Sequence, residues 1–181
     1  MREVSLLEFL ELLQPPPPTP PDEICQCGGG KPVKLMCALT SNPIRCIDCN
    51  LEIEPSLLPL TESVTRGIAY WRHLYDAIDR LWLDSREYEA WARSQLSDIN
   101  SPINRTGLEA RAALDPLRRC YYWLFQDESV EDFQPITQFP ICGAAFLQEF
   151  DASWPQSRCE TCSIVTVIHF LRMGKPRGYF S

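Results

Sequence analysis

The residues of this chain best suited to chemistry are its cysteines, because six of the nine stand in closely spaced pairs. The pairs are Cys25 with Cys27, Cys46 with Cys49, and Cys159 with Cys162. A CxxC turn places two thiolates about one edge of a tetrahedron apart, so two such turns can close a four-sulfur site. Soft sulfur ligands in this number select zinc. The spacing therefore predicts bound Zn²⁺.

A disulfide framework is the alternative use of these cysteines, and it requires an oxidising compartment and an export signal. The leucine-rich stretch 1–13 is interrupted by Glu8 and Glu11, and no small-residue cleavage site follows it. No segment reaches the roughly 18 consecutive apolar residues of a membrane span. We therefore expect a cytoplasmic protein with reduced thiols.

The first predicted metal site lies within residues 25–60, which read as a small zinc ribbon. A strand over residues 32–39 and a turn over residues 40–43 separate the two cysteine pairs, as one hairpin would. Cys37 lies on that strand and could replace Cys25. The expected ligands are Cys25, Cys27, Cys46 and Cys49.

The second predicted site resembles a zinc ribbon with one ligand missing. Residues 139–143 have the shape of a CPxCG turn, but Phe139 stands where the first cysteine would be. Three thiolates are too few for a closed structural site. An apolar residue in the vacated space favours a site that is empty or binds weakly. The expected ligands are Cys142, Cys159 and Cys162, and Cys120, Cys37 or His169 could supply a fourth.

Hydrophobic spacing and turn residues divide the chain into four segments. Residues 1–24 predict a short amphipathic helix over 5–13 and a polyproline linker. Residues 25–60 form the zinc ribbon, residues 61–135 a helical unit, and residues 136–181 a degenerate second ribbon with a tail. The expected fold class is α+β, with short antiparallel strands in the ribbons.

Three helices are expected in the central unit. The first runs from a cap at Thr61 or Ser63 to about Leu83. The second is capped by Asp84. The third is capped by Thr106 and ends or kinks at Pro116. Aromatic side chains on these helices, Tyr88 and Trp91 among them, are expected in the core. Residues 121–125 read as a strand or a last helical turn.

Several blocks together resemble a bacterial family of zinc-ribbon-containing proteins of unknown function, for which nucleic-acid binding has been suggested. The resemblance covers roughly residues 43–165 and implies a cytosolic zinc protein. Phe139 departs from the family pattern. The matching blocks are residues 43–49, 67–71, 81–92, 101–107, 120–125, 140–143 and 158–162. The resemblance implies metal ligation by Cys46, Cys49, Cys142, Cys159 and Cys162.

Catalysis has little support in these residues. A catalytic zinc keeps an open position and usually has His or Glu ligands, yet His73 and His169 have no metal-ligand spacing. Cys120 follows two arginines that could activate its thiol, but no base accompanies it in the sequence. We expect a protein that is not an enzyme.

Net charge favours protein binding over nucleic-acid binding, the two function classes that remain. Nucleic-acid binding requires clustered basic residues, whereas this chain has a net charge of −7, and only its last residues lean basic. Charge complementarity instead favours a basic protein partner. An immunity protein that blocks a basic bacterial toxin is one such case, and a nucleic-acid-binding or transcription-associated zinc ribbon is the alternative. The candidate contact residues are Asp76, Asp79, Asp84, Glu87, Glu89, Asp127, Glu128, Glu131 and Asp132.

Overall fold

One five-stranded sheet joins the two cysteine-bearing parts of the chain. The computed structural model describes residues 19–28, 30–38, 42–129, 133–146 and 156–167. Its sheet has the order β2-β1-β3-β5-β4. The strands are β1 (Val33–Leu35), β2 (Ile44–Cys46), β3 (Cys120–Trp123), β4 (Gln156–Arg158) and β5 (Ile164–Val167). The fold is mixed α+β, as the sequence predicted.

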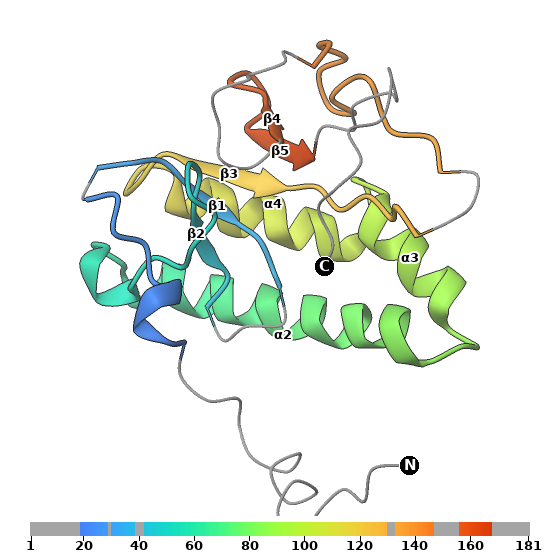
Figure 1. The fold of residues 1–181 in the computed structure, drawn as a ribbon, viewed down its shortest axis with the longest axis horizontal. Coiled ribbons are helices and arrows are strands. Elements are labelled where there is room, and N and C mark those ends of the chain that lie inside the picture. The colour runs from blue at the N-terminus through green and yellow to red at the C-terminus, as the bar shows by residue number, and fades with distance from the viewer. Residues whose placement is uncertain (1–18, 29, 39–41, 130–132, 147–155, 168–181) are drawn as a thin grey trace, which may run out of the picture.

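The sheet is mixed: its two hairpins are antiparallel, and the strand between them, β3, is parallel to its neighbour on each side. β1 pairs antiparallel with β2, and β5 pairs antiparallel with β4. Between the hairpins, β3 pairs in parallel with β1 on one side and with β5 on the other. Parallel pairing needs a crossover connection. For β1 and β3 it contains the helices between β2 and β3, and for β3 and β5 it contains β4. The two cysteine-bearing hairpins therefore share one sheet (Figure 1).

Three helices cover the sheet on the side shown below it in Figure 1. Helix α4 packs against β1 and β3, and helix α2 packs against both α3 and α4. Within the described residues, no helix is both long enough and apolar enough to cross a membrane. The bounds are α2 (Glu62–Asp84), α3 (Glu89–Ser97) and α4 (Pro102–Leu114), with two 3-10 turns at Pro21–Glu23 and Pro55–Leu57.

The start of α2 and the end of α4 agree with the sequence predictions. The Thr61 hydroxyl accepts a hydrogen bond from Val64 N at 3.3 Å, so it caps α2. Helix α4 ends at Leu114, before Pro116. The predicted helix over residues 5–13 lies outside the described residues.

The starts of α3 and α4 differ from the predictions. Asp84 ends α2, and a turn through Arg86, whose φ is +57°, delays α3 to Glu89. Helix α4 begins before Thr106, because Ser101 caps it by accepting from Asn104 N at 3.2 Å and a proline follows the cap. The sequence around Asp84 and Thr106 has capping-box spacing, but no helix begins at either residue.

The core forms where α2 and α4 meet β3. The rings of Trp71 and Tyr122 pack edge to face with centroids 5.7 Å apart. The Tyr122 hydroxyl donates to the Asn104 Oδ1 at 2.7 Å, and the Asn104 amide donates to the Leu96 carbonyl at 2.9 Å. Gly107 lets α4 approach both rings, because a Cβ there would lie 2.3 Å from the Tyr122 ring and 2.6 Å from Trp71 Nε1.

Candidate metal centre

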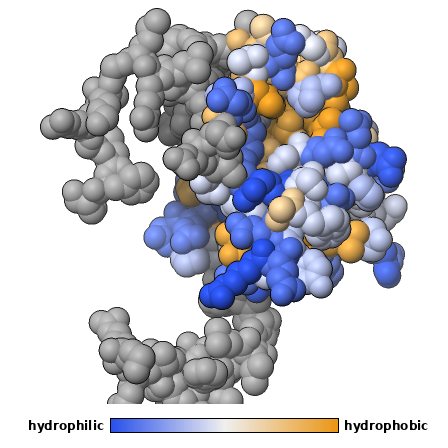
Figure 2. Space-filling model, turned by 90° about the vertical axis from the view of Figure 1, so that its right-hand side faces the viewer, coloured by the Kyte–Doolittle hydropathy of each residue, from blue (hydrophilic) through white to orange (hydrophobic). Residues whose placement is uncertain are grey.

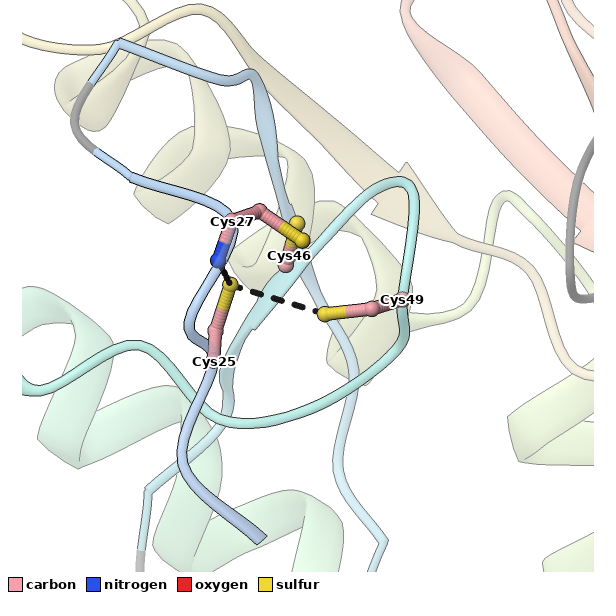
Figure 3. A group of neighbouring side chains, drawn as sticks. All are labelled: Cys25, Cys27, Cys46 and Cys49. Carbon is pink, nitrogen blue, oxygen red and sulfur yellow. Dashed lines mark hydrogen bonds between the residues drawn. The ribbon is translucent and has the colours of Figure 1, made fainter. Parts of the chain in front are cut away.

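Four cysteines converge at the end of the β1–β2 hairpin, and we refer to them as the N-terminal cluster. They are Cys25, Cys27, Cys46 and Cys49, and all four sulfurs lie within 4.8 Å of one another. The Sγ atoms of Cys25 and Cys49 are 3.5 Å apart and point toward each other (Figure 3). Zinc–sulfur bonds of about 2.3 Å in a tetrahedron imply sulfur separations of about 3.8 Å. The cluster thus has the ligand number and spacing of a closed metal site, consistent with zinc.

Backbone pairing brings the two cysteine pairs of this cluster together. Cys46 ends β2, and its carbonyl accepts from Asn50 N at 3.1 Å to close the turn that carries Cys49. The chain then pairs with the segment around Cys25, because Cys25 N donates to the Glu52 carbonyl at 2.7 Å. The sequence left open whether Cys25 or Cys37 completes the site, and this pairing places Cys25 there.

The thiols of the N-terminal cluster are not equivalent. Burial raises the pKa of Cys25 well above its ordinary value. Burial also opposes ionisation of Cys49, but a hydrogen bond from the Leu51 N–H and the neighbouring thiols lower its pKa. Cys49 therefore ionises more readily than Cys25, and metal binding must displace protons from thiols that are still protonated. Affinity for metal should consequently fall with falling pH.

A buried lysine lies close enough to the N-terminal cluster to feel the charge of its thiolates. Lys34 is fully buried on β1, where its Nζ donates to Gln156 Oε1 at 2.8 Å and lies 4.9 Å from the centroid of the Trp123 ring. Burial lowers the pKa of Lys34 to about 7, while the thiolates of Cys46 and Cys49 raise it. A zinc ion with four thiolates carries a net charge of −2, so it would favour the charged form of this amine. Sequence reasoning missed Lys34, although a lysine inside an apolar strand is a recognisable signal.

The second group, which we name the C-terminal cluster, contains Cys142, Cys159 and Cys162. The Cys142 sulfur lies 3.5 Å from that of Cys159 and 3.6 Å from that of Cys162. The three thiols therefore have ligand spacing, as the sequence predicted. Among the described residues neither Cys37 nor Cys120 joins the group, and His169 lies outside them.

Cys120 belongs to the core and not to a reactive site. It is fully buried on β3, where burial raises the pKa of its thiol to about 12. A thiol with this pKa is protonated at neutral pH and is a poor nucleophile. The two preceding arginines do not activate it.

The predicted acidic contact residues fall into distinct environments. Asp79 and Asp127 are buried, so for these two the prediction of a partner contact is corrected. Burial and the neighbouring Asp76 raise the pKa of Asp79 to about 6. Of the others, Asp76 and Glu89 are in ion pairs. Asp84, Glu87 and Glu128 are exposed. Glu131 and Asp132 lie outside the described residues.

Asp127 is a structural carboxylate that ties the chain after β3 to two helices. Its Oδ2 accepts from Trp82 Nε1 at 3.1 Å and from the Arg93 guanidinium, and its Oδ1 accepts from Ser129 N at 2.9 Å. Burial opposes ionisation, but these donors outweigh it and lower the pKa of Asp127 below its ordinary 3.8.

We expect Asp127→Asn to lower the free energy of unfolding by about 2 kcal/mol, because charge-assisted hydrogen bonds are lost. Urea denaturation at neutral pH measures this. The stabilisation is present above pH 3.8 and is lost as pH falls through the lowered pKa, so the difference between wild type and variant should shrink in acid. An equal loss from Glu87→Gln, at an exposed carboxylate, would contradict this role.

Three large apolar side chains are exposed where α2 turns into α3. Leu83 is 47% exposed, Tyr88 57% and Trp91 50%. Tyr88 and Trp91 were predicted in the core, and the delayed start of α3 turns them outward instead. Carboxylates accompany them, since Asp84, Glu87 and Glu89 outnumber the single Arg86. We name residues 83–91 the α2–α3 corner.

A hollow of 270 Å³ lies beside the other flank of α3. Leu124, Phe125 and Ile136 line it together with Arg93 and Ser97 of the helix. Figure 2 faces this side of the molecule and shows apolar residues gathered in its upper part, with hydrophilic residues around them. Apolar surface thus accompanies α3 on both flanks.

Comparisons of this chain with protein-family models, with curated proteins and with solved structures gave no match. The resemblance to a bacterial zinc-ribbon family therefore stays a prediction that rests on the quoted residues.

Proposed function

We propose that this chain is a non-catalytic, cytoplasmic zinc protein built from two zinc-ribbon-like hairpins, and that it acts by binding a basic protein partner. In this proposal the N-terminal cluster holds a structural zinc. All four ligands are protein thiolates, so no coordination position remains for a substrate.

The observation that carries the binding proposal is the exposure of Leu83, Tyr88 and Trp91 in the α2–α3 corner. Aromatic side chains dominate the energy of protein interfaces, and exposed apolar groups ringed by charge are typical of docking surfaces. The carboxylates of the corner select a partner of opposite charge. A toxin with a basic active cleft has this chemistry, and the chain would then be its immunity protein.

Nucleic-acid binding is the weaker candidate, because ion pairs occupy many of the basic side chains. Phosphates would have to compete with carboxylates that these arginines already contact. The arginines in ion pairs are Arg45, Arg66, Arg80, Arg93, Arg111, Arg119 and Arg158.

The test is affinity capture from the native host with the immobilised protein, followed by titration of the purified captured partner. We expect a basic partner whose affinity falls about 100-fold for the Leu83→Ala/Tyr88→Ala/Trp91→Ala variant, because each side chain is an anchor of about 1 kcal/mol or more. The control is Leu57→Ala/Tyr70→Ala, which removes exposed apolar groups elsewhere and should leave the affinity unchanged.

Three results would overturn the proposal. The corner variant would bind as tightly as wild type, no partner would be captured, or generic DNA or RNA would bind with sub-micromolar affinity at low salt. The last result would instead support the nucleic-acid candidate.

A further inference from the structure

Three turns of this chain have the same backbone pattern, although only two of them begin with cysteine. In each turn the first residue accepts the N–H of the fourth residue after it and donates its own N–H to the carbonyl of the fifth. The residue four positions after the first has a positive φ in every turn, namely 61°, 56° and 70°. The three sets are Cys46, Asn50 and Leu51; Cys159, Ser163 and Ile164; and Phe139, Gly143 and Ala144.

Phe139 therefore occupies the position of a first metal ligand in a correctly formed turn. Its own contacts explain why the turn forms without that ligand. Phe139 is 1% exposed, and its ring packs against Phe146 with centroids 4.6 Å apart. Burial of this aromatic ring stabilises the turn and so offsets part of the metal–sulfur bond that is missing.

The opposite turn of the C-terminal cluster is also held by protein contacts. Glu160 lies between Cys159 and Cys162, and its carboxylate accepts from Arg119 Nη2 at 3.1 Å and from the Tyr121 hydroxyl. Both partners belong to β3 or immediately precede it. The two turns that carry the thiols are thus anchored to the core independently of any ion.

The edge of the C-terminal cluster faces solvent. Cys142 is exposed, and its neighbours Ile141 and Gly143 are exposed with it. The N-terminal cluster differs, because its four thiols complete a tetrahedron by themselves. Three thiols at ligand spacing with an accessible edge are the arrangement of a zinc site that keeps one open position.

We propose that Cys142, Cys159 and Cys162 bind a second zinc ion through three thiolates, and that a solvent molecule, which a small thiol can displace, fills the fourth position. Phe139 fixes the turn but supplies no ligand atom. The site is therefore accessible to exogenous ligands, whereas the N-terminal site is closed.

Cobalt(II) tests this directly, because its visible absorption bands report ligand type and exchange at tetrahedral sites. We expect the wild-type chain to bind two equivalents of Co²⁺, with one set of bands that shifts when 2-mercaptoethanol is added and one that does not. Cys142→Ser should lose the shifting set. Phe139→Cys should keep the second equivalent but abolish its response, because the new thiolate closes the site.

The bands that do not shift with added thiol report cobalt at the N-terminal site. Their absence would therefore show that the N-terminal site does not bind metal, independently of the result for the C-terminal cluster. The proposal is wrong if the wild-type chain binds only the unresponsive equivalent, if added thiol shifts neither set, or if Cys142→Ser retains the responsive set. Circular dichroism of both variants verifies that they fold.

Discussion

The Cys46→Ser/Cys49→Ser variant should lose the zinc of the N-terminal cluster and fail to form the β1–β2 hairpin. Structural zinc in small ribbons contributes about 10 kcal/mol, which is comparable to the whole stability of a typical domain, about 5–15 kcal/mol. The effect should reach the rest of the sheet, because β1 pairs directly with β3. Elemental analysis and urea denaturation measure the two losses.

The matched control is Cys142→Ser/Cys162→Ser, which removes the same number of thiols from the C-terminal cluster. Because Phe139 and Glu160 hold that region through protein contacts, this variant should lose less than about 2 kcal/mol. Equal destabilisation by the two double variants, or undiminished zinc in Cys46→Ser/Cys49→Ser, would contradict the assignment of the N-terminal cluster.

Gly107→Ala should destabilise the protein by about 3 kcal/mol or prevent folding. The added methyl group would overlap the Tyr122 ring and Trp71 Nε1 at 2.3 and 2.6 Å, and both rings are fully buried. Neither ring can move without disturbing the core, so α4 must shift away from β3. Thermal denaturation followed by near-ultraviolet circular dichroism would detect both the loss of stability and the disturbed rings.

Gly67→Ala provides the same chemical change without the overlap. Gly67 lies in α2, and a Cβ there would have no atom within 4 Å. Alanine is the better helix former, so this variant should be more stable by about 0.5–1 kcal/mol. If both glycine variants behaved alike, close packing at Gly107 would not be the reason for its glycine.

The sequence was sufficient to predict which cysteines gather at ligand spacing, because the signals are local. A CxxC turn sets the separation of its own two sulfurs, and hairpin length sets the distance between turns. The seven cysteines proposed as ligands form the two groups found in the structure. The choice between Cys25 and Cys37 could not be predicted, because it depends on the pairing of Cys25, which precedes the hairpin, with Glu52, which follows it.

The sheet could not be predicted, because its central pairings join distant parts of the chain. Val33 pairs with Cys120, and Tyr122 pairs with Ile164, which no local pattern encodes. The exposure of Tyr88 and Trp91 was missed for a different reason. The prediction began the second helix at Asp84, and the positive φ of Arg86 shifts that start and with it the face that each aromatic side chain occupies.

The central claim is that the N-terminal cluster holds a structural zinc through four thiolates. Zinc K-edge X-ray absorption on the Cys142→Ser/Cys162→Ser variant measures this most directly, because only the N-terminal cluster remains complete. We expect one zinc per chain with four sulfur ligands at about 2.3 Å. A protein without zinc, a zinc with nitrogen or oxygen ligands, or a disulfide within the cluster would contradict it.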